Sequence, residues 1–156
     1  MKNIILITMF LTFLFSACTQ IPPIDLGGGY KIDYDGNGYS ILIDNNNNNI
    51  IVVSPHITNF KFDSTFIVVE QKPYDLIMKD AYLNPEMNLK KFLKIFEKST
   101  LRYYWIINKK EKSEYSFDTL TQFARYSNVY GPFKEEDYFK KRKELGVPDK
   151  LDLKMD

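Results

Sequence analysis

Short hydrophobic runs separated by polar turns dominate the first half of the chain. Between residues 30 and 71 these runs are rich in β-branched and aromatic residues, a pattern typical of β-strands. The strands it predicts are 30–32, 39–43, 50–53, 59–62 and 66–70. The asparagines at 45–49 favour a turn, because Asn tolerates left-handed backbone and bonds to its own main chain. Asp63 and Ser64 mark another turn, so this part predicts an antiparallel meander of about five strands.

After residue 73 the hydrophobic period becomes helical. Apolar side chains recur three and four residues apart, with lysines on the opposite side. These apolar residues are Leu89, Phe92, Leu93 and Phe96. Asn84 and Pro85 are typical of a helix start, so we expect a helix over roughly 85–98. We expect this helix to cover one face of the sheet, and a later strand to follow it over 102–107.

Two further helices are predicted in the last third of the chain. Asp118 has the character of a cap for a short helix that ends near residue 124. The segment 134–145 places acidic residues in its first turn and basic residues later, the order that the helix dipole favours. Its apolar face is thin, chiefly Phe139 and Leu145, which predicts a peripheral position. The predicted fold is therefore α+β in a single domain, with the sheet partly covered by two or three helices.

The hydrophobic pattern at the N-terminus differs from both the strand pattern and the helical pattern. Lys2 is followed by an almost unbroken apolar run from Ile4 to Phe15, and Ser16 and Ala17 are small. A positive start, an apolar centre and small residues before a cleavage point are the three parts of an export signal. The sequence therefore predicts an exported protein.

Cys18, the only cysteine of the chain, comes directly after this signal. The run Phe15-Ser16-Ala17-Cys18 resembles the lipobox of bacterial lipoproteins. The resemblance implies that the Cys18 thiol takes a diacylglyceryl group and becomes the new first residue. One alternative is a transmembrane helix, but the apolar run of twelve residues is shorter than the ~20 that span a bilayer. The other is an ordinary signal peptide cut after Ala17, which would leave an unpaired thiol on an exported domain.

These features predict four segments and a neutral mature chain. The segments are a signal peptide over 1–17, a lipidated N-terminus and tether over 18–29, the α+β domain over 30–150 and a C-terminal tail over 151–156. Lys2 is the only charged residue of the first segment, so the rest carries 20 basic and 20 acidic residues. A neutral chain lacks the attraction that nucleic acids require, and we expect no nucleic-acid partner. With Cys18 carrying lipid no disulfide can form, so stability has to come from burial.

Residues 33–44 follow the calcium-loop pattern of an EF-hand. Asp33, Asp35 and Asn37 place oxygens at positions 1, 3 and 5, Gly38 stands at position 6, and Asp44 takes position 12 instead of Glu. The flanking residues have strand character, whereas an EF-hand has a helix on each side. An Asp-Gly-Asn-Gly hairpin turn is the alternative, and we favour it over a calcium site. No other cofactor is expected.

The sequence contains few of the residue arrangements that catalysis commonly uses. His56 is the sole histidine, which excludes multi-histidine zinc sites, and no serine lies in a Gly-x-Ser-x-Gly elbow. A pair of carboxylates could still act as in a glycosidase, and several lie near the ends of predicted strands. These are Glu70, Asp75, Asp80 and Glu86, and the sequence does not single out a pair.

Aromatic residues offer a candidate binding surface. Tyr103, Tyr104 and Trp105 are consecutive, and Tyr126, Tyr130 and Tyr138 follow them along the chain. Such residues could stack on sugars or on a peptide. The alternative, which we favour, is that they suit strands and pack between sheet and helices.

Two stretches carry a family resemblance. One runs from Phe62 to Gln71; the other runs from Trp105 through the segment 130–133 to the segment 139–148. They resemble small uncharacterised lipoproteins of Bacteroidota-type bacteria, which are built around a domain of unknown function. The resemblance implies an anchor and a single domain, and it transfers no functional residues because the family carries no assigned activity.

The function predicted from these observations is that of a membrane-anchored lipoprotein of the cell envelope. We expect the lipid on Cys18 to hold it in a membrane, the outer membrane being favoured over the inner. A non-enzymatic binding or accessory role is favoured, with another envelope protein, a glycan or a peptide as partner. The alternatives are a small carboxylate-dependent glycan hydrolase and a calcium-stabilised module.

Overall fold

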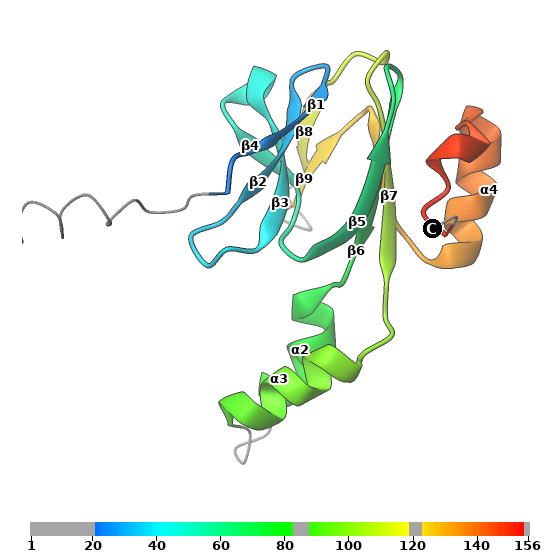
Figure 1. Cartoon of the computed structure of the whole chain (residues 1–156). Coiled ribbons are helices and arrows are strands. Elements are labelled where there is room, and N and C mark those ends of the chain that lie inside the picture. The colour runs from blue at the N-terminus through cyan, green and yellow to red at the C-terminus, as the bar shows by residue number, and fades with distance from the viewer. Residues whose placement is uncertain (1–20, 83–87, 119–122, 155–156) are drawn as a thin grey trace, which may run out of the picture.

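Ten strands and three α-helices lie in the part of the chain that the computed structural model describes, residues 21–82, 88–118 and 123–154. The strands form two four-stranded antiparallel sheets and one two-stranded hairpin (Figure 1). The predicted α+β class is confirmed. The predicted meander is divided, however, because its strands belong to two sheets that face each other.

The first sheet has the order β1-β2-β3-β4. Its strands are β1 (Ile24–Gly27), β2 (Tyr30–Tyr34), β3 (Ser40–Asp44) and β4 (Ile50–Val53). The β2–β3 turn is closed by Asp35, whose Oδ1 accepts the N–H groups of Asn37 and Tyr39. The asparagine-rich turn contains the short 3-10 helix η1 (Asn45–Asn47), followed by Asn48 with a left-handed φ of 54°. Both predicted hairpins are therefore confirmed.

The second sheet has the order β10-β7-β6-β5. Its strands are β5 (Ile57–Phe62), β6 (Phe66–Gln71), β7 (Tyr103–Asn108) and β10 (Val129–Phe133). The predicted turn between β5 and β6 is formed by Asp63, whose Oδ1 accepts the N–H groups of Thr65 and Phe66. β6 and β7 are the central strands and are covered on both faces, which explains why Phe66 to Val69 is an uninterrupted apolar run.

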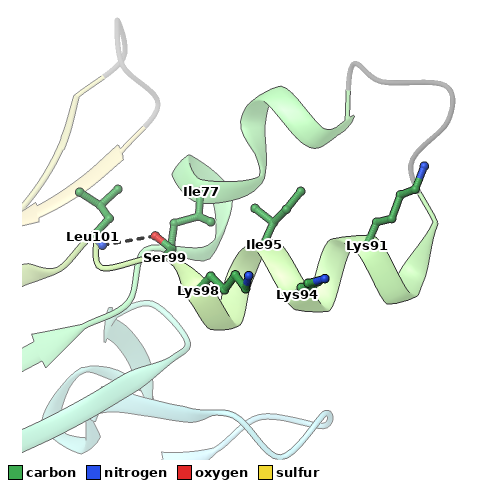
Figure 2. Close-up of a pocket in the computed structure, with 7 residues that line it drawn as sticks. All are labelled: Ile77, Lys91, Lys94, Ile95, Lys98, Ser99 and Leu101. Atoms are coloured by element: carbon green, nitrogen blue, oxygen red, sulfur yellow. Dashed lines mark hydrogen bonds between the residues drawn. The ribbon is translucent and has the colours of Figure 1, made fainter.

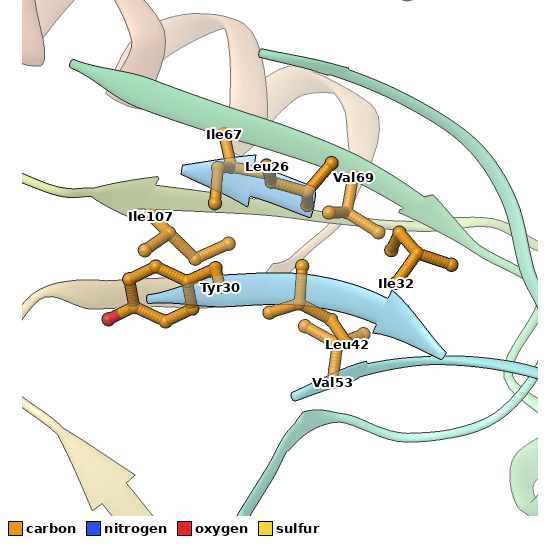
Figure 3. Packing of buried hydrophobic residues seen from close by; sticks show 8 residues of the cluster. All are labelled: Leu26, Tyr30, Ile32, Leu42, Val53, Ile67, Val69 and Ile107. Atoms are coloured by element: carbon orange, nitrogen blue, oxygen red, sulfur yellow. The ribbon is translucent and has the colours of Figure 1, made fainter. Parts of the chain in front are cut away.

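Two hydrophobic cores lie on opposite faces of this second sheet. The first fills the space between the sheets, where Leu26, Tyr30, Ile32, Leu42 and Val53 meet Ile67, Val69 and Ile107 (Figure 3). The second lies between the second sheet and helix α4 (Glu135–Leu145), and its members are Phe66, Val68, Tyr104, Ile106, Tyr138, Val147, Leu151 and Leu153. The architecture is therefore sheet, sheet and helix in three layers.

Helix α4 is more central than its thin apolar face predicted. Tyr138 is 1% exposed and its ring stacks on that of Tyr104, with centroids 4.8 Å apart. Arg142 is also buried; its guanidinium donates to the carbonyl of Pro148 and lies 3.4 Å from the carboxylate of Asp152. The prediction was wrong because it counted only aliphatic and Phe positions. Here a tyrosine ring and an arginine stem supply the buried surface.

Other predicted helices also differ from the structure. The short helix predicted after Asp118 lies partly outside the described residues, and its described ends are strands instead: β8 (Tyr115–Asp118) pairs with β9 (Phe123–Tyr126). Helix α2 (Tyr74–Tyr82) was not predicted. Helix α3 (Leu89–Lys98) begins later than predicted, after its cap Asn88, and Asn84 and Pro85 lie outside the described residues.

The domain also extends further at both ends than the sequence predicted. β1 lies within the segment assigned to the tether and places Leu26 in the first core. Leu151 and Leu153, assigned to the tail, belong to the second core, and η2 (Asp149–Leu151) precedes Leu153. Leu151 and Leu153 were assigned to the tail because isolated leucines in a polar stretch give no periodic signal. Their burial in the second core shows that they belong to the domain.

Replacing Leu153 by Ala should lower the free energy of unfolding by about 2–4 kcal/mol, because a buried leucine leaves a cavity behind. Urea denaturation followed by circular dichroism measures this change. The matched control is Ile51→Ala in β4, where the side chain is 50% exposed and the change should stay within about 0.5 kcal/mol. Equally small effects at both positions would show that the C-terminal segment is not part of the core.

Candidate functional site

Helices α2 and α3 form an arm that projects from one end of the second sheet (Figure 1). Gln71, the last residue of β6, pairs with Tyr103, the first residue of β7. The whole arm is therefore inserted between two residues that lie opposite each other in the sheet. This placement contradicts the prediction that α3 covers the sheet. The two helices instead pack on each other beyond its end.

An aromatic cluster, the joint, fastens this arm to the body of the protein. It consists of Tyr39, His56, Tyr74 and Phe96. The His56 ring stacks on Tyr74 of α2 with centroids 5.0 Å apart and an interplanar angle of 12°. Its centroid also lies 4.8 Å from that of Phe96 in α3 and 4.0 Å from that of Tyr39. The joint therefore connects both helices of the arm with residues next to β3 and β5.

Polar contacts reinforce the joint from the side of β6. Lys72 is buried, donates from Nζ to the carbonyl of Glu97 at 3.0 Å, and holds that ammonium 4.6 Å from the centre of the Phe96 ring. Gln71 donates to the carbonyls of Ser54 and Pro55, and its Oε1 accepts the indole N–H of Trp105. Cation–π contacts of this type gain strength when the cation is partly desolvated.

The environment of His56 favours its neutral form. Partial burial lowers the pKa of His56 below its ordinary value, and the negative charges of Asp35 and Asp75 oppose this shift only in part. The residue also has a left-handed φ of 72°, a conformation in which His and Asn are more frequent than most residues. The sole histidine thus serves as a neutral aromatic ring in the joint, and no catalytic partner contacts it among the described residues.

The stability of the protein should therefore fall as the pH decreases below about 6.5. The unfolded chain binds the His56 proton more tightly than the folded one, so the stabilisation is complete above the unfolded pKa and is lost below it. Urea midpoints at about pH 7.5 and about pH 5.5 measure the loss.

The control is His56→Asn, which suits the left-handed backbone and does not titrate in this range. This variant should show a smaller loss of stability between the two pH values than the unaltered protein. An equal loss in both proteins would contradict the assignment, since other groups would then account for it.

Helix α3 is amphipathic, yet none of its residues is buried. Phe92 and Phe96 face the joint, where both rings contact Tyr74. Leu89 and Leu93 lie roughly 60° further round the helix, next to the side that faces the joint. They are 73% and 45% exposed, and Ile95 on the other flank is 41% exposed. The apolar arc of α3 is therefore wider than the part of it that α2 and the joint cover.

A groove runs along the flank of α3 that carries Ile95. It has a volume of about 670 Å³ and is lined by Ile77, Lys91, Lys94, Ile95, Lys98, Ser99 and Leu101 (Figure 2). Ile77 of α2, Ile95 and Leu101 supply its apolar surface, and the lysines stand along its rim. A hydrogen bond from the N–H of Leu101 to the Ser99 hydroxyl shapes its inner end. The groove contains no carboxylate.

The exposed side of α3 is strongly basic. The helix carries four lysines and a single glutamate, Glu97. No ion pair joins Lys90, Lys94 or Lys98 to a carboxylate within the described residues. Since the whole chain has a net charge of only +1, this is a local concentration of positive charge next to exposed apolar side chains.

The predicted calcium ligands are divided between the two ends of the β2–β3 hairpin. Asp33 lies opposite Ile41, whereas Asp44 lies opposite Tyr30, about 10 Å along the strand. The Lys31 ammonium and the Tyr34 N–H hold the pKa of Asp33 below its usual range, and the two oxygens of Asp44 accept from Asn46 and Asn47. Asp35 closes the turn, as the hairpin alternative predicted, and Asn37 follows it there. Among the described residues, no group of three or more His, Cys, Asp or Glu side chains is placed to hold a metal ion.

The three consecutive aromatic residues of β7 do not share a surface. Side chains alternate along a strand, so Tyr104 enters the second core while Trp105 packs against the first. Tyr103 precedes them at the end of β7 nearest the arm. Tyr104 and Trp105 thus pack against different cores, on opposite faces of β7.

Two of the four candidate carboxylates, Glu70 and Asp75, have side chains among the described residues. Glu70 accepts from the Thr58 hydroxyl and pairs with Arg102 at 3.2 Å, while Asp75 lies exposed in the first turn of α2. The side chains of Asp80 and Glu86 lie outside the description, as does Cys18. No helix in the described parts of the chain is long and apolar enough to cross a membrane.

Sequence reasoning missed the arm, although two signals for it were present. Residues 74–82 contain strong helix formers after Pro73 and an acid, Asp75, in the first turn, which favours a helix start. Leu89 and Leu93 also widen the apolar arc of α3 beyond the Phe92–Phe96 stripe that one neighbouring helix can cover.

Comparison with known proteins gives a family and nothing more specific. A family model with the description "Protein of unknown function (DUF3997)" matches residues 27–156. No curated protein and no solved structure matches the chain. The match covers most of the chain, so the protein belongs to this family, and the expectation of a domain of unknown function is confirmed.

Proposed function

We propose that the protein is an envelope lipoprotein, anchored through Cys18, that acts by binding rather than by catalysis, with the arm as its binding surface. The observation that carries the proposal is that α3 exposes apolar side chains on both flanks, Leu89 and Leu93 on one and Ile95 on the other, with a row of lysines between them. Exposed apolar residues that gather on one element, with a polar rim, are typical of interaction surfaces.

The design of the arm supports a binding role. None of the residues of its helices belongs to the two hydrophobic cores that hold the sheets and α4 together. The joint nevertheless holds it in place through several ring contacts and the buried Lys72. A surface that is already fixed in position has little conformational freedom left to lose on binding, so binding costs less entropy.

The anchoring part of the proposal predicts that Cys18→Ser releases the protein from the membrane. Once residues 1–17 have been removed, a chain without an acyl group keeps only the surface of the domain as a membrane contact, and stable anchoring takes more than one weak signal. Fractionation of cells with a carbonate wash measures this. Thr19→Ser, a similar change one residue away, should leave the protein in the membrane fraction. Retention, after the wash, of Cys18→Ser protein whose mass shows that residues 1–17 have been removed would exclude a lipid anchor on this residue.

The binding part predicts that a photo-crosslinker placed on the arm forms adducts in intact cells. Benzoylphenylalanine replaces Leu93, which is exposed on α3, and in the control it replaces Lys112, whose side chain is 84% exposed in the segment before β8. Irradiation should yield adducts, to lipid or to protein, from the Leu93 position and none from Lys112. The absence of any adduct at Leu93, or the same adducts at both positions, would exclude the arm as a binding surface.

A further inference from the structure

We infer that the arm rests on an anionic membrane surface, with α3 against the lipid headgroups, and thereby fixes which way the anchored domain faces. The inference rests on the proposed anchor at Cys18 and names what the arm binds. It follows from three observations: the length of the tether, the charge of α3 and the arrangement of its leucines and lysines.

The tether is short compared with the domain. β1 begins at Ile24, so the chain from Cys18 to the first strand contains six residues, which span at most about 20 Å when extended. A domain of this length is about 35 Å across. A lipid on Cys18 therefore keeps some face of the domain close to the bilayer at all times, and only a face compatible with headgroups can stay there.

The arm has the chemistry of such a face. Among the described residues, the exposed large hydrophobic side chains of the arm are Leu76, Leu89, Leu93 and Ile95. They accompany the four lysines of α3, which oppose a single glutamate. A helix that combines apolar residues with a lysine-rich polar side binds at the headgroup boundary of anionic bilayers.

The arrangement along α3 allows both groups to act together. Leu89 and Leu93 form one row at a spacing of four residues, and Lys90, Lys94 and Lys98 form a second row about 100° away. Lysines extend their ammonium groups to phosphates while their stems cover apolar surface, so the leucines can enter the interface beside them. Each lysine near an anionic surface strengthens binding by roughly fivefold.

Helix α4 differs from α3 in the balance of its charges and in the cover of its apolar side. It also carries exposed lysines, Lys140 and Lys143, but it begins with three acidic residues and its buried side faces the second core. Positive charge on α4 is therefore balanced within the helix. On α3 it is not balanced within the helix, and the neighbouring apolar surface is uncovered.

The anchor makes a weak contact sufficient. Once Cys18 holds the domain at the bilayer, docking of the arm is an intramolecular event at high effective concentration. The arm need not provide membrane affinity of its own. Its effect is on orientation: with α3 against the lipid, the sheets stand away from the bilayer, because the arm projects from their end (Figure 1).

The test uses the lipidated protein reconstituted in vesicles and an environment-sensitive dye on Leu93→Cys. Cys18 is the only native cysteine and its thiol is occupied by lipid, so the dye reacts at the new position alone. A second protein carries the dye on Lys112→Cys as the control. In vesicles of phosphatidylglycerol and phosphatidylethanolamine we expect a blue shift of the dye at position 93, reversed by high salt, and no shift at position 112.

A paired charge reversal tests the electrostatic part. Lys90→Glu with Lys94→Glu should reduce the ratio of docked to undocked dye at position 93 by at least roughly 25-fold, whereas Lys140→Glu with Lys143→Glu, the same change of charge on α4, should leave it unaltered. Circular dichroism establishes that both variants keep the helical content of the parent protein.

The outcomes separate this inference from the proposed function. A protein that stays with the vesicles in high salt but shows no blue shift at position 93 overturns the inference and leaves the lipid anchor intact. A shift of equal size in neutral phosphatidylcholine vesicles overturns the role of charge. A shift that appears only when an acidic protein is added assigns the arm to a protein partner instead. A protein that leaves the vesicles in high salt contradicts the anchor, and with it both proposals.

Discussion

Both hydrophobic cores are built against the same pair of strands, β6 and β7. Their ladder runs without a break from Phe66 opposite Asn108 to Gln71 opposite Tyr103. Alternate side chains of this pair enter the core shared with the first sheet and the core shared with α4. Because the pair is covered on both faces, its backbone hydrogen bonds are shielded from water, and the elements on either side are positioned relative to one rigid wall. The arm continues from the end of β6 and β7, and these two strands therefore set the direction in which it projects.

Turn chemistry made the hairpins predictable, because it acts within a few residues. Asp35, Asn48 and Asp63 each close a turn through their own side chain or backbone conformation, and these contacts do not depend on the rest of the fold. The α+β class followed from the change of hydrophobic period after residue 73. The hairpin interpretation of the EF-hand-like segment followed from the strand character of its flanks.

The division into two sheets could not be predicted, because it depends on which faces meet in space. The alternation along β6 places Ile67 and Val68 on opposite faces, but it does not record which element covers each face, nor that Tyr138 rather than an aliphatic residue buries α4. The candidate site was missed for a related reason. A leucine at position 89 looks the same in the sequence whether a sheet covers it or not, and only the position of the arm beyond the sheet shows that it is exposed.

The insertion point of the arm has a consequence for how this scaffold can change. Gln71 and Tyr103 are paired whatever lies between them, so the ladder constrains only the ends of the inserted segment. Changes in the helices that keep the ring contacts of Tyr74 and Phe96 with His56 should leave this pair in place. The exposed positions of the arm are thus the part of the sequence that is most free to diversify. Grafting a different helical pair at this position is a route to new recognition properties on an unaltered domain.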